Sequence, residues 1–198
     1  MKFPLALTKP VVLASGSPRR PELLRKLGID FRVHPSDIDE GKVSGLPPAE
    51  IVCELARRKA WSVAELYDEG LIIGVDTIVV LGNKVLGKPA SADEAREMLA
   101  ELSGRTHEVF TGCAIVDRPE GRTKVEAERT AVTFRPLHAS EIAAYVESGA
   151  ALDKAGAYGI QDFSAVFVER IDGCFYNVVG FPLTRFYLML RDFCAVSQ

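Results

Sequence analysis

The 198-residue sequence has few of the residues that build disulfide-stapled folds or structural zinc sites. It contains four cysteines, Cys53, Cys113, Cys174 and Cys194, and no two of them form a CxxC pair. This scattering favours reduced thiols and argues against a zinc site or a disulfide framework. We therefore expect most of the cysteines to be small core residues, with Cys194 exposed near the end of the chain.

Long apolar runs are also missing, because no stretch approaches the length that crosses a bilayer. Pro4 and Lys9 interrupt the first apolar residues before a signal-peptide core can form. These absences predict a cytoplasmic protein with no membrane partner. The formal net charge is −3, so no overall positive field would attract a nucleic-acid polymer. A polyanionic ligand would need a local cluster of cations.

Internal repeats, low-complexity tracts and a clear linker are absent as well. The composition, with 47% hydrophobic and 26% charged residues, is that of an ordinary globular protein. A chain of 198 residues can bury a substantial core in one domain or in two small lobes. We predict a single domain over residues 1–198.

The strongest local signal is a change from strand to loop to helix near the start of the chain. Val11 to Leu13 form an apolar run typical of a buried strand, and Ser15-Gly16-Ser17 ends it. Ser17 suits the N-cap of the following helix, and Pro18 suits its first turn. The helix is expected to stop at Gly28.

Two arginines, Arg19 and Arg20, occupy the first turn of this helix. Cations there are unfavourable to the helix dipole, so stability alone would favour acidic residues. The misplaced charge, together with the hydroxyl of Ser15 and the free N–H groups of the helix start, favours a phosphate site over two solvated arginines. The motif is neither a Walker A loop nor a GxGxxG fingerprint.

Residues 71–81 form the most apolar run and predict a central strand, with Asp76 in its middle. A carboxylate buried alone costs several kcal/mol, so Asp76 must be paired, metal-bound or exposed in a cleft. This pattern favours a functional carboxylate over a structural ion pair. Gly74 lets backbone or ligand come close. A hairpin at Gly82-Asn83 returns the chain so that Lys88 lies near the strand of Asp76.

Two further charged segments admit both a functional and a plain interpretation. The helix that opens at Pro47-Pro48 carries Arg57, Arg58 and Lys59 on its polar face, where solvation is the simpler interpretation for any one of them. The acidic loop over residues 36–41, with Glu40, is either solvated surface or a source of hard oxygen ligands for a divalent cation.

The remaining elements follow from periodicity and turn signals. We expect helices over 91–102, 140–148 and 183–190 and strands over 31–34, 106–116, 124–134, 166–171 and 175–179. Lone histidines such as His34 and His107 are more typical of structural positions than of catalysis. Residues 153–161 have neither amphipathic pattern and predict a binding loop.

Eight blocks taken in order resemble the Maf family of nucleoside triphosphate pyrophosphatases. They are LASGSPRR, IDE, ELARRKA, GVDTIVV, GKP, LSGRTHEVFTG, LDKAGAYGIQ and NVVGFPL, and they span nearly the whole chain. The resemblance implies an α/β fold with a mixed twisted sheet in two lobes around a central cleft, similar to inosine triphosphatases. It also implies hydrolysis of a nucleoside triphosphate between the α and β phosphates, with Mg²⁺ or Mn²⁺, and leaves a homodimer possible.

The resemblance implies roles residue by residue. Ser15, Arg19, Arg20, Lys59 and Lys88 would hold the triphosphate, Glu40 and Asp76 the metal, and Asp76 would accept the proton from water. Arg19, Thr77 and Gln161 match the branch that acts on dTTP and UTP.

The sister branch, which acts on 7-methyl-GTP, has an aromatic residue, glutamine and glutamate at the positions of Arg19, Thr77 and Gln161. This chain departs from the family where Asp162 and Ser164 replace common glycines, which would stiffen the loop or add charge beside the base.

Two alternatives stay open, the 7-methyl-GTP activity and a nucleotide-binding regulator of cell division with little turnover. A pure binder would not need Asp76. The preferred nucleotide among dTTP, UTP and modified pyrimidines also stays open.

Overall fold

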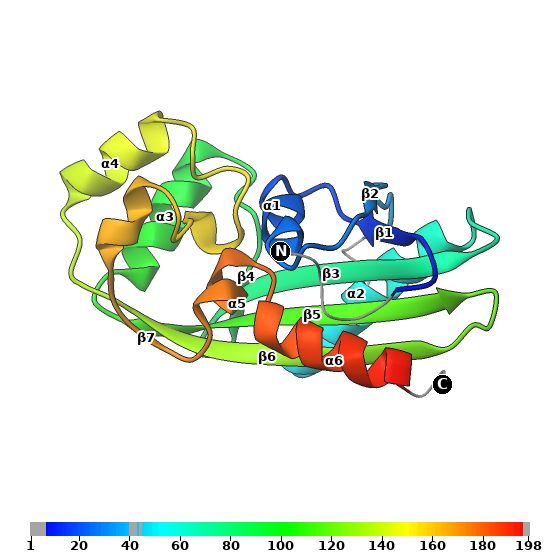
Figure 1. Cartoon of the computed structure of the whole chain (residues 1–198). Coiled ribbons are helices and arrows are strands. Elements are labelled where there is room, and N and C mark those ends of the chain that lie inside the picture. Colours follow the sequence, from blue (N-terminus) through cyan, green and yellow to red (C-terminus); the bar gives the residue numbers. More distant parts are fainter. Residues whose placement is uncertain (1–6, 40–42, 44, 196–198) are drawn as a thin grey trace. The chain divides into compact units, whose positions relative to one another are not determined.

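The structure is a computed structural model that describes residues 7–39, 43 and 45–195 (Figure 1). The strands are β1 (Val11–Ala14), β2 (Arg32–Val33), β3 (Gly70–Leu81), β4 (Lys84–Leu86), β5 (Thr106–Arg118), β6 (Thr123–Phe134) and β7 (Val168–Asp172). The α-helices are α1 (Arg19–Arg25), α2 (Pro48–Ala64), α3 (Ala92–Leu102), α4 (Ala139–Glu147), α5 (Phe175–Val179) and α6 (Leu183–Ala195). Two 3₁₀ helices, η2 (Ala155–Ala157) and η3 (Phe163–Phe167), lie between α4 and β7.

The strands form one mixed sheet in the order β2-β1-β3-β5-β6-β7, with β4 paired to β3. β1 is parallel to both β2 and β3, and its register sets Ala14 beside Gly74. β4 is antiparallel to β3, and β7 is antiparallel to β6. The predicted α/β class with a mixed sheet is therefore confirmed, as is the hairpin at Gly82-Asn83. In the part of the chain that the structure describes, no helix has the length and apolar character needed to span a membrane.

The chain divides into two compact units. The first unit comprises the described parts of residues 1–76, 111–128 and 180–198, and the second comprises residues 77–110 and 129–179. Strand β3 passes from the first unit into the second between Asp76 and Thr77. The single domain and the central cleft that the resemblance implies stay predictions.

In the first unit, α2 packs directly on the sheet because glycines face it. A Cβ built on Gly74 of β3 would overlap the Ala56 carbonyl oxygen and lie 2.7 Å from the Ala60 nitrogen. A Cβ on Gly112 of β5 would lie 2.8 Å from the Cys53 nitrogen. The backbone of α2 thus occupies the space that side chains would fill, and the close approach at Gly74 is that of protein backbone.

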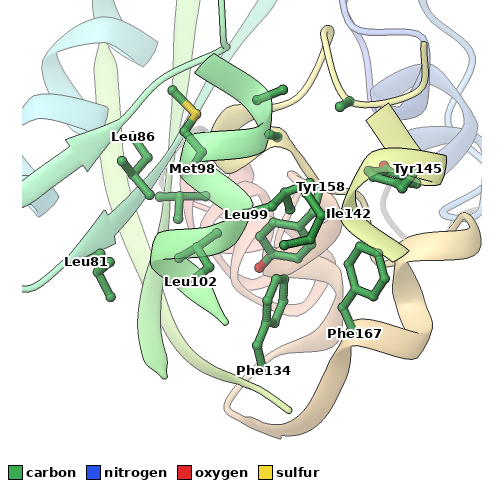
Figure 2. Close-up of a cluster of buried hydrophobic side chains, with 14 of the residues drawn as sticks. Leu81, Leu86, Met98, Leu99, Leu102, Phe134, Ile142, Tyr145, Tyr158 and Phe167 are labelled. Atoms are coloured by element: carbon green, nitrogen blue, oxygen red, sulfur yellow. The ribbon is translucent and has the colours of Figure 1, made fainter. Parts of the chain in front are cut away.

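The second unit has its own core, which Figure 2 shows in close-up. The buried face of α3 is Ala95, Met98, Leu99 and Leu102, as its periodicity predicts. Phe134 of β6 meets the ring of Tyr158 edge-on, with the centroids 4.8 Å apart. Since Tyr158 belongs to the irregular segment 153–161, the core holds that segment in place.

Three predictions about local structure are wrong. The N-cap of α1 is Pro18, whose ring has no hydrogen-bond acceptor, and the Ser17 N–H donates to Ser15 Oγ at 3.3 Å. Residues 175–179 form the short helix α5 in place of a strand. The strand predicted over 166–171 is β7, which begins only at Val168 because residues 163–167 form η3. In α5 the buried Asn177 Nδ2 donates to the Val109 carbonyl at 2.9 Å, so a tertiary contact overrides β propensity.

The cysteine prediction holds in part. All four thiols are free, but Cys113 alone is buried, whereas Cys53, Cys174 and Cys194 are half-buried. The other predicted elements agree with the structure to within a few residues at each end.

Candidate functional site

Asp76 lies in the buried strand β3 and is itself 5% exposed. Its Oδ1 accepts a hydrogen bond from the Lys59 ammonium of α2 at 2.6 Å, and both side chains are less than a tenth exposed. Of the three states open to a buried carboxylate, Asp76 therefore adopts the paired one. Gly74, two residues earlier, allows the close approach of α2 that makes this ion pair possible.

The burial of Lys59 corrects the expectation of a solvated helical face at this position. Lys59 follows Leu55 by four residues and Ala56 by three, so it shares the face that packs on the sheet. That spacing is the signal in the sequence that could have identified it. Arg57 and Arg58 do lie on the wetter face, where both donate to Glu54. The hydrogen bond from Arg57, supported by Arg58, lowers the pKa of Glu54 to about 2.

The second oxygen of Asp76, Oδ2, has no hydrogen-bond partner within the described residues. A carboxylate with one oxygen held by a lysine and the other unoccupied by protein donors can accept a proton or bind a cation through that second oxygen. The hydrogen bond from Lys59 restricts the rotation of this carboxylate.

The two neighbouring arginines of α1 have different environments. Arg20 is buried, and it donates from Nη1 to Ser15 Oγ and from Nε to the Gly180 carbonyl, both at 3.0 Å. Arg19 is half-buried. Arg20 thus ties the loop after β1 to the turn before α6, while also bringing a positive charge beside Ser15. Gly180 was not among the predicted site residues, although it lies in the block NVVGFPL that carries part of the resemblance.

The predicted metal ligands are tested only in part by the described residues. Glu40 lies outside them, and residues 36–39 of the acidic loop have neither helix nor strand. Among the described residues, no group of three or more His, Cys, Asp or Glu side chains could hold a metal ion. The donor chemistry fits a hard cation, because Asp76 and Glu40 would both supply carboxylate oxygens.

The second unit contains the other predicted residues. Thr77 follows Asp76 directly in β3 and is half-buried, and Lys88 and Gln161 are exposed. The Gly87 carbonyl accepts from the Gly156 N–H at 3.0 Å, which joins the segment of Lys88 to the segment that leads to Gln161. Within the described residues of this unit, the Lys88 ammonium makes no hydrogen bond or ion pair.

Two residues, His107 and Ala157, lie in or contact the segment that leads to Gln161. His107 is 1% exposed, and its Nε2 lies 2.8 Å from the hydroxyl of Tyr158. Burial lowers the pKa of His107 to about 4, so the ring is neutral at physiological pH and the structural interpretation of His107 is supported. Ala157, beside Tyr158, has a φ of 61°, a strained backbone conformation for a residue with a side chain.

Comparison with known proteins places these features in a family. A family model described as Maf-like protein matches residues 10–193. A protein of Moorella thermoacetica called dTTP/UTP pyrophosphatase is 52% identical, over 92% of this chain and 94% of its own length. One of Desulforamulus reducens with the same name is 45% identical, over 93% and 97%.

Among solved structures, the chain is similar to the Ham1 protein of Staphylococcus aureus, at 17% identity and a TM-score of 0.46, over 64% of this chain and 72% of that one. The family model covers β1 through most of α6, including Ser15, the ion pair of Lys59 with Asp76, and Gln161. The chain belongs to the Maf family.

Proposed function

We propose that this protein hydrolyses dTTP and UTP to the nucleoside monophosphate and pyrophosphate, as a housekeeping enzyme of the nucleotide pool. The observation that carries the proposal is the carboxylate of Asp76, which is buried in a central strand and accepts a hydrogen bond from Lys59 at Oδ1. The names of relatives that match over more than nine-tenths of this chain support the substrate class.

Hydrolysis at the α-phosphate requires an oriented water, a proton acceptor and neutralisation of the triphosphate charge. In this proposal the carboxylate of Asp76 accepts the proton from the attacking water. Lys59 holds the carboxylate in place until that step. One hydrogen of the Lys59 ammonium is donated to Asp76. Lys59 would therefore act on the triphosphate through Asp76 or by donating a second hydrogen to a phosphate oxygen.

The triphosphate would be bound by Ser15, Arg19, Arg20 and Lys88. Arg20 is already oriented by Ser15 and by the Gly180 carbonyl, which reduces the entropy lost when it binds an anion. Lys88, exposed and without a partner in its own unit, is able to follow a flexible phosphate chain.

Asp76 and Glu40 would hold a divalent cation, Mg²⁺ or Mn²⁺. Such an ion, when bound, screens the charge of phosphate oxygens and acidifies water in its coordination sphere. Thr77 and Gln161, together with Arg19, would distinguish the base. The amide of Gln161 offers one donor and one acceptor group, which match O4 and N3–H of uracil or thymine.

The test is release of pyrophosphate from dTTP, UTP, GTP and 7-methyl-GTP, with Mg²⁺, with Mn²⁺ and with a chelator. We expect release from dTTP and UTP in the presence of metal, and its loss in the Asp76→Asn variant excludes a contaminating phosphatase. Asp93→Asn, which changes an exposed carboxylate of α3, is the matched control. Release from 7-methyl-GTP alone would instead indicate the sister activity. Tight nucleotide binding without turnover would indicate a regulator.

A further inference from the structure

The exposed Gln161 lies in a tight turn whose two ends are bonded to each other. The Asp162 N–H donates to the Gly159 carbonyl at 3.1 Å, and Ile160 between them is buried. Gly159 rests on the aliphatic stem of Lys154, since a Cβ there would lie 2.5 Å from Lys154 Cε. The turn is therefore anchored by one buried residue and one glycine, while Gln161 itself is exposed.

The carboxylate of Asp162 faces into this turn and is bonded by several donors. Its Oδ1 accepts from the Ser164 N–H at 2.9 Å, and the Ser164 hydroxyl lies 2.6 Å from the same oxygen. The Tyr145 hydroxyl lies 3.2 Å from Oδ2, and the Lys154 ammonium lies 3.3 Å from it. Because the same ammonium also contacts Asp153 Oδ1 at 2.8 Å, Lys154 offsets the negative charge of Asp162 only in part. Of the two effects expected for this departure from the family, stiffening the loop is the one that the geometry supports.

Ser164 closes the network from the other side. Its side chain is fully buried, and its Oγ accepts from the Gly159 N–H at 2.9 Å. The single hydroxyl proton has two acceptors within reach, the Gly159 carbonyl at 2.9 Å and the Asp162 carboxylate at 2.6 Å. The charged and nearer acceptor forms the stronger hydrogen bond. Both ends of the turn that carries Gln161 are therefore bonded to Ser164 or to Asp162.

We infer that Asp162 and Ser164 are positioning residues for Gln161, which hold its amide in the orientation that recognises a pyrimidine base. The inference rests on the proposed function. Because the network orders the turn before the nucleotide arrives, these two residues would lower the entropy lost when the base binds. Asp162 does not touch the base in this scheme; it acts through Gln161.

The experiment is a double-mutant cycle with Asp162→Ala, Gln161→Ala and both together, measuring kcat and KM for dTTP and UTP. We expect KM to rise about tenfold in each single variant with kcat nearly unchanged, because the base is bound equally in the ground and transition states. The double variant should be no worse than Gln161→Ala. Inorganic tripolyphosphate, which lacks a base, should inhibit all forms with the same Ki.

Asp162→Asn is the conservative variant, since its amide oxygen still accepts from the Ser164 N–H, and it should retain a KM within about threefold of the wild type. A double variant with a hundredfold increase in KM, or a tripolyphosphate Ki that rises with KM, would overturn the inference while leaving the proposed function intact. If the wild-type enzyme released no pyrophosphate from dTTP or UTP, the proposed function and the inference would both fall.

Discussion

At the scale of single residues, the site depends on which cations of two charged runs are buried. Arg19 and Arg20 are neighbours, as are Arg57, Arg58 and Lys59, yet Arg20 and Lys59 alone among them are buried. Each lies on the apolar face of its helix, three or four residues from buried neighbours. A buried cation needs a nearby acceptor, and Asp76 provides one for Lys59.

The ion pair of Lys59 with Asp76 should contribute to stability and to activity in separable ways. Lys59→Met should lower the free energy of unfolding by about 3–5 kcal/mol, because it leaves a buried carboxylate without its counter-charge. The double variant Lys59→Met/Asp76→Asn should recover most of that loss while remaining inactive. Denaturant titration and pyrophosphate release on the single and double variants check this. Recovery of turnover in the double variant would show that Asp76 is not the proton acceptor.

Arg20 and Lys88 should differ when each is changed to alanine. Arg20→Ala removes two buried hydrogen bonds and should cost about 2–3 kcal/mol of unfolding free energy. Lys88→Ala should leave the melting temperature within a degree or so, because an exposed side chain without partners adds little stability, and it should raise KM for the nucleotide. Thermal melts and steady-state kinetics distinguish the two. Equal losses of stability in both variants would contradict the proposed exposure of Lys88 to ligand.

At the scale of elements, the packing of α2 on the sheet decides where Lys59 lies. The helix approaches β3 and β5 at Gly74 and Gly112, where any side chain would overlap its backbone. Its own contact residues are small as well, since Ala56, Ala60 and Ala64 face the sheet. The short distance between helix and strand brings the lysine within reach of the buried carboxylate.

Gly74→Ala should therefore be strongly unfavourable. The added methyl group meets backbone, which cannot rotate away, so we expect a loss of about 1–3 kcal/mol or more and a fall in turnover as Lys59 moves from Asp76. Gly87→Ala is the matched control for stability, because a Cβ there meets nothing within 4 Å. Denaturation curves measure both variants. A melting temperature of Gly74→Ala equal to that of Gly87→Ala would show that α2 is able to shift without cost.

At the scale of the whole molecule, the long strands β3, β5 and β6 belong to both compact units, and each unit has its own buried cluster. In the second unit, His107 on β5 is bonded to Tyr158, which joins the strand to the segment that leads to Gln161. Because burial disfavours the imidazolium form, protonation of His107 opposes the folded state of that core.

Global stability should accordingly fall as the solution is acidified. The pKa of His107 is about 4 in the folded protein and near 6.5 when unfolded, so the unfolded chain binds the extra proton between these values. The contribution of neutral His107 to stability is fully present above pH 6.5. The free energy of unfolding should drop by about 2 kcal/mol on going from pH 7.5 to 5. Glu54 and Glu141, with pKa values of about 2, act below this window.

Urea titrations at pH 7.5 and 5 measure the effect, with His107→Gln as the variant that keeps a hydrogen-bonding group but cannot be charged. Its unfolding free energy should change little across the same range. A wild-type protein equally stable at both pH values would contradict the burial of a neutral His107.

The sequence by itself determined the features that depend on near neighbours in the chain. The spacing of apolar residues defines the faces of α2 and α3, the apolar run defines β3, and Gly82-Asn83 defines the hairpin, since these signals act within a few residues. The order of eight motifs was enough to indicate the family. These signals depend only on the order of residues along the chain.

The tertiary structure alone decided which charged residues are paired and which groups contact Asp162. Lys59 and Asp76 are 17 positions apart, and Arg20 reaches a carbonyl 160 positions away, so no periodicity relates them. The helix α5 forms because Asn177 bonds to strands β5 and β6, against the β propensity of its own residues. Asp162 turns its carboxylate toward Ser164, Tyr145 and Lys154, and this orientation depends on how three separate segments pack in one core.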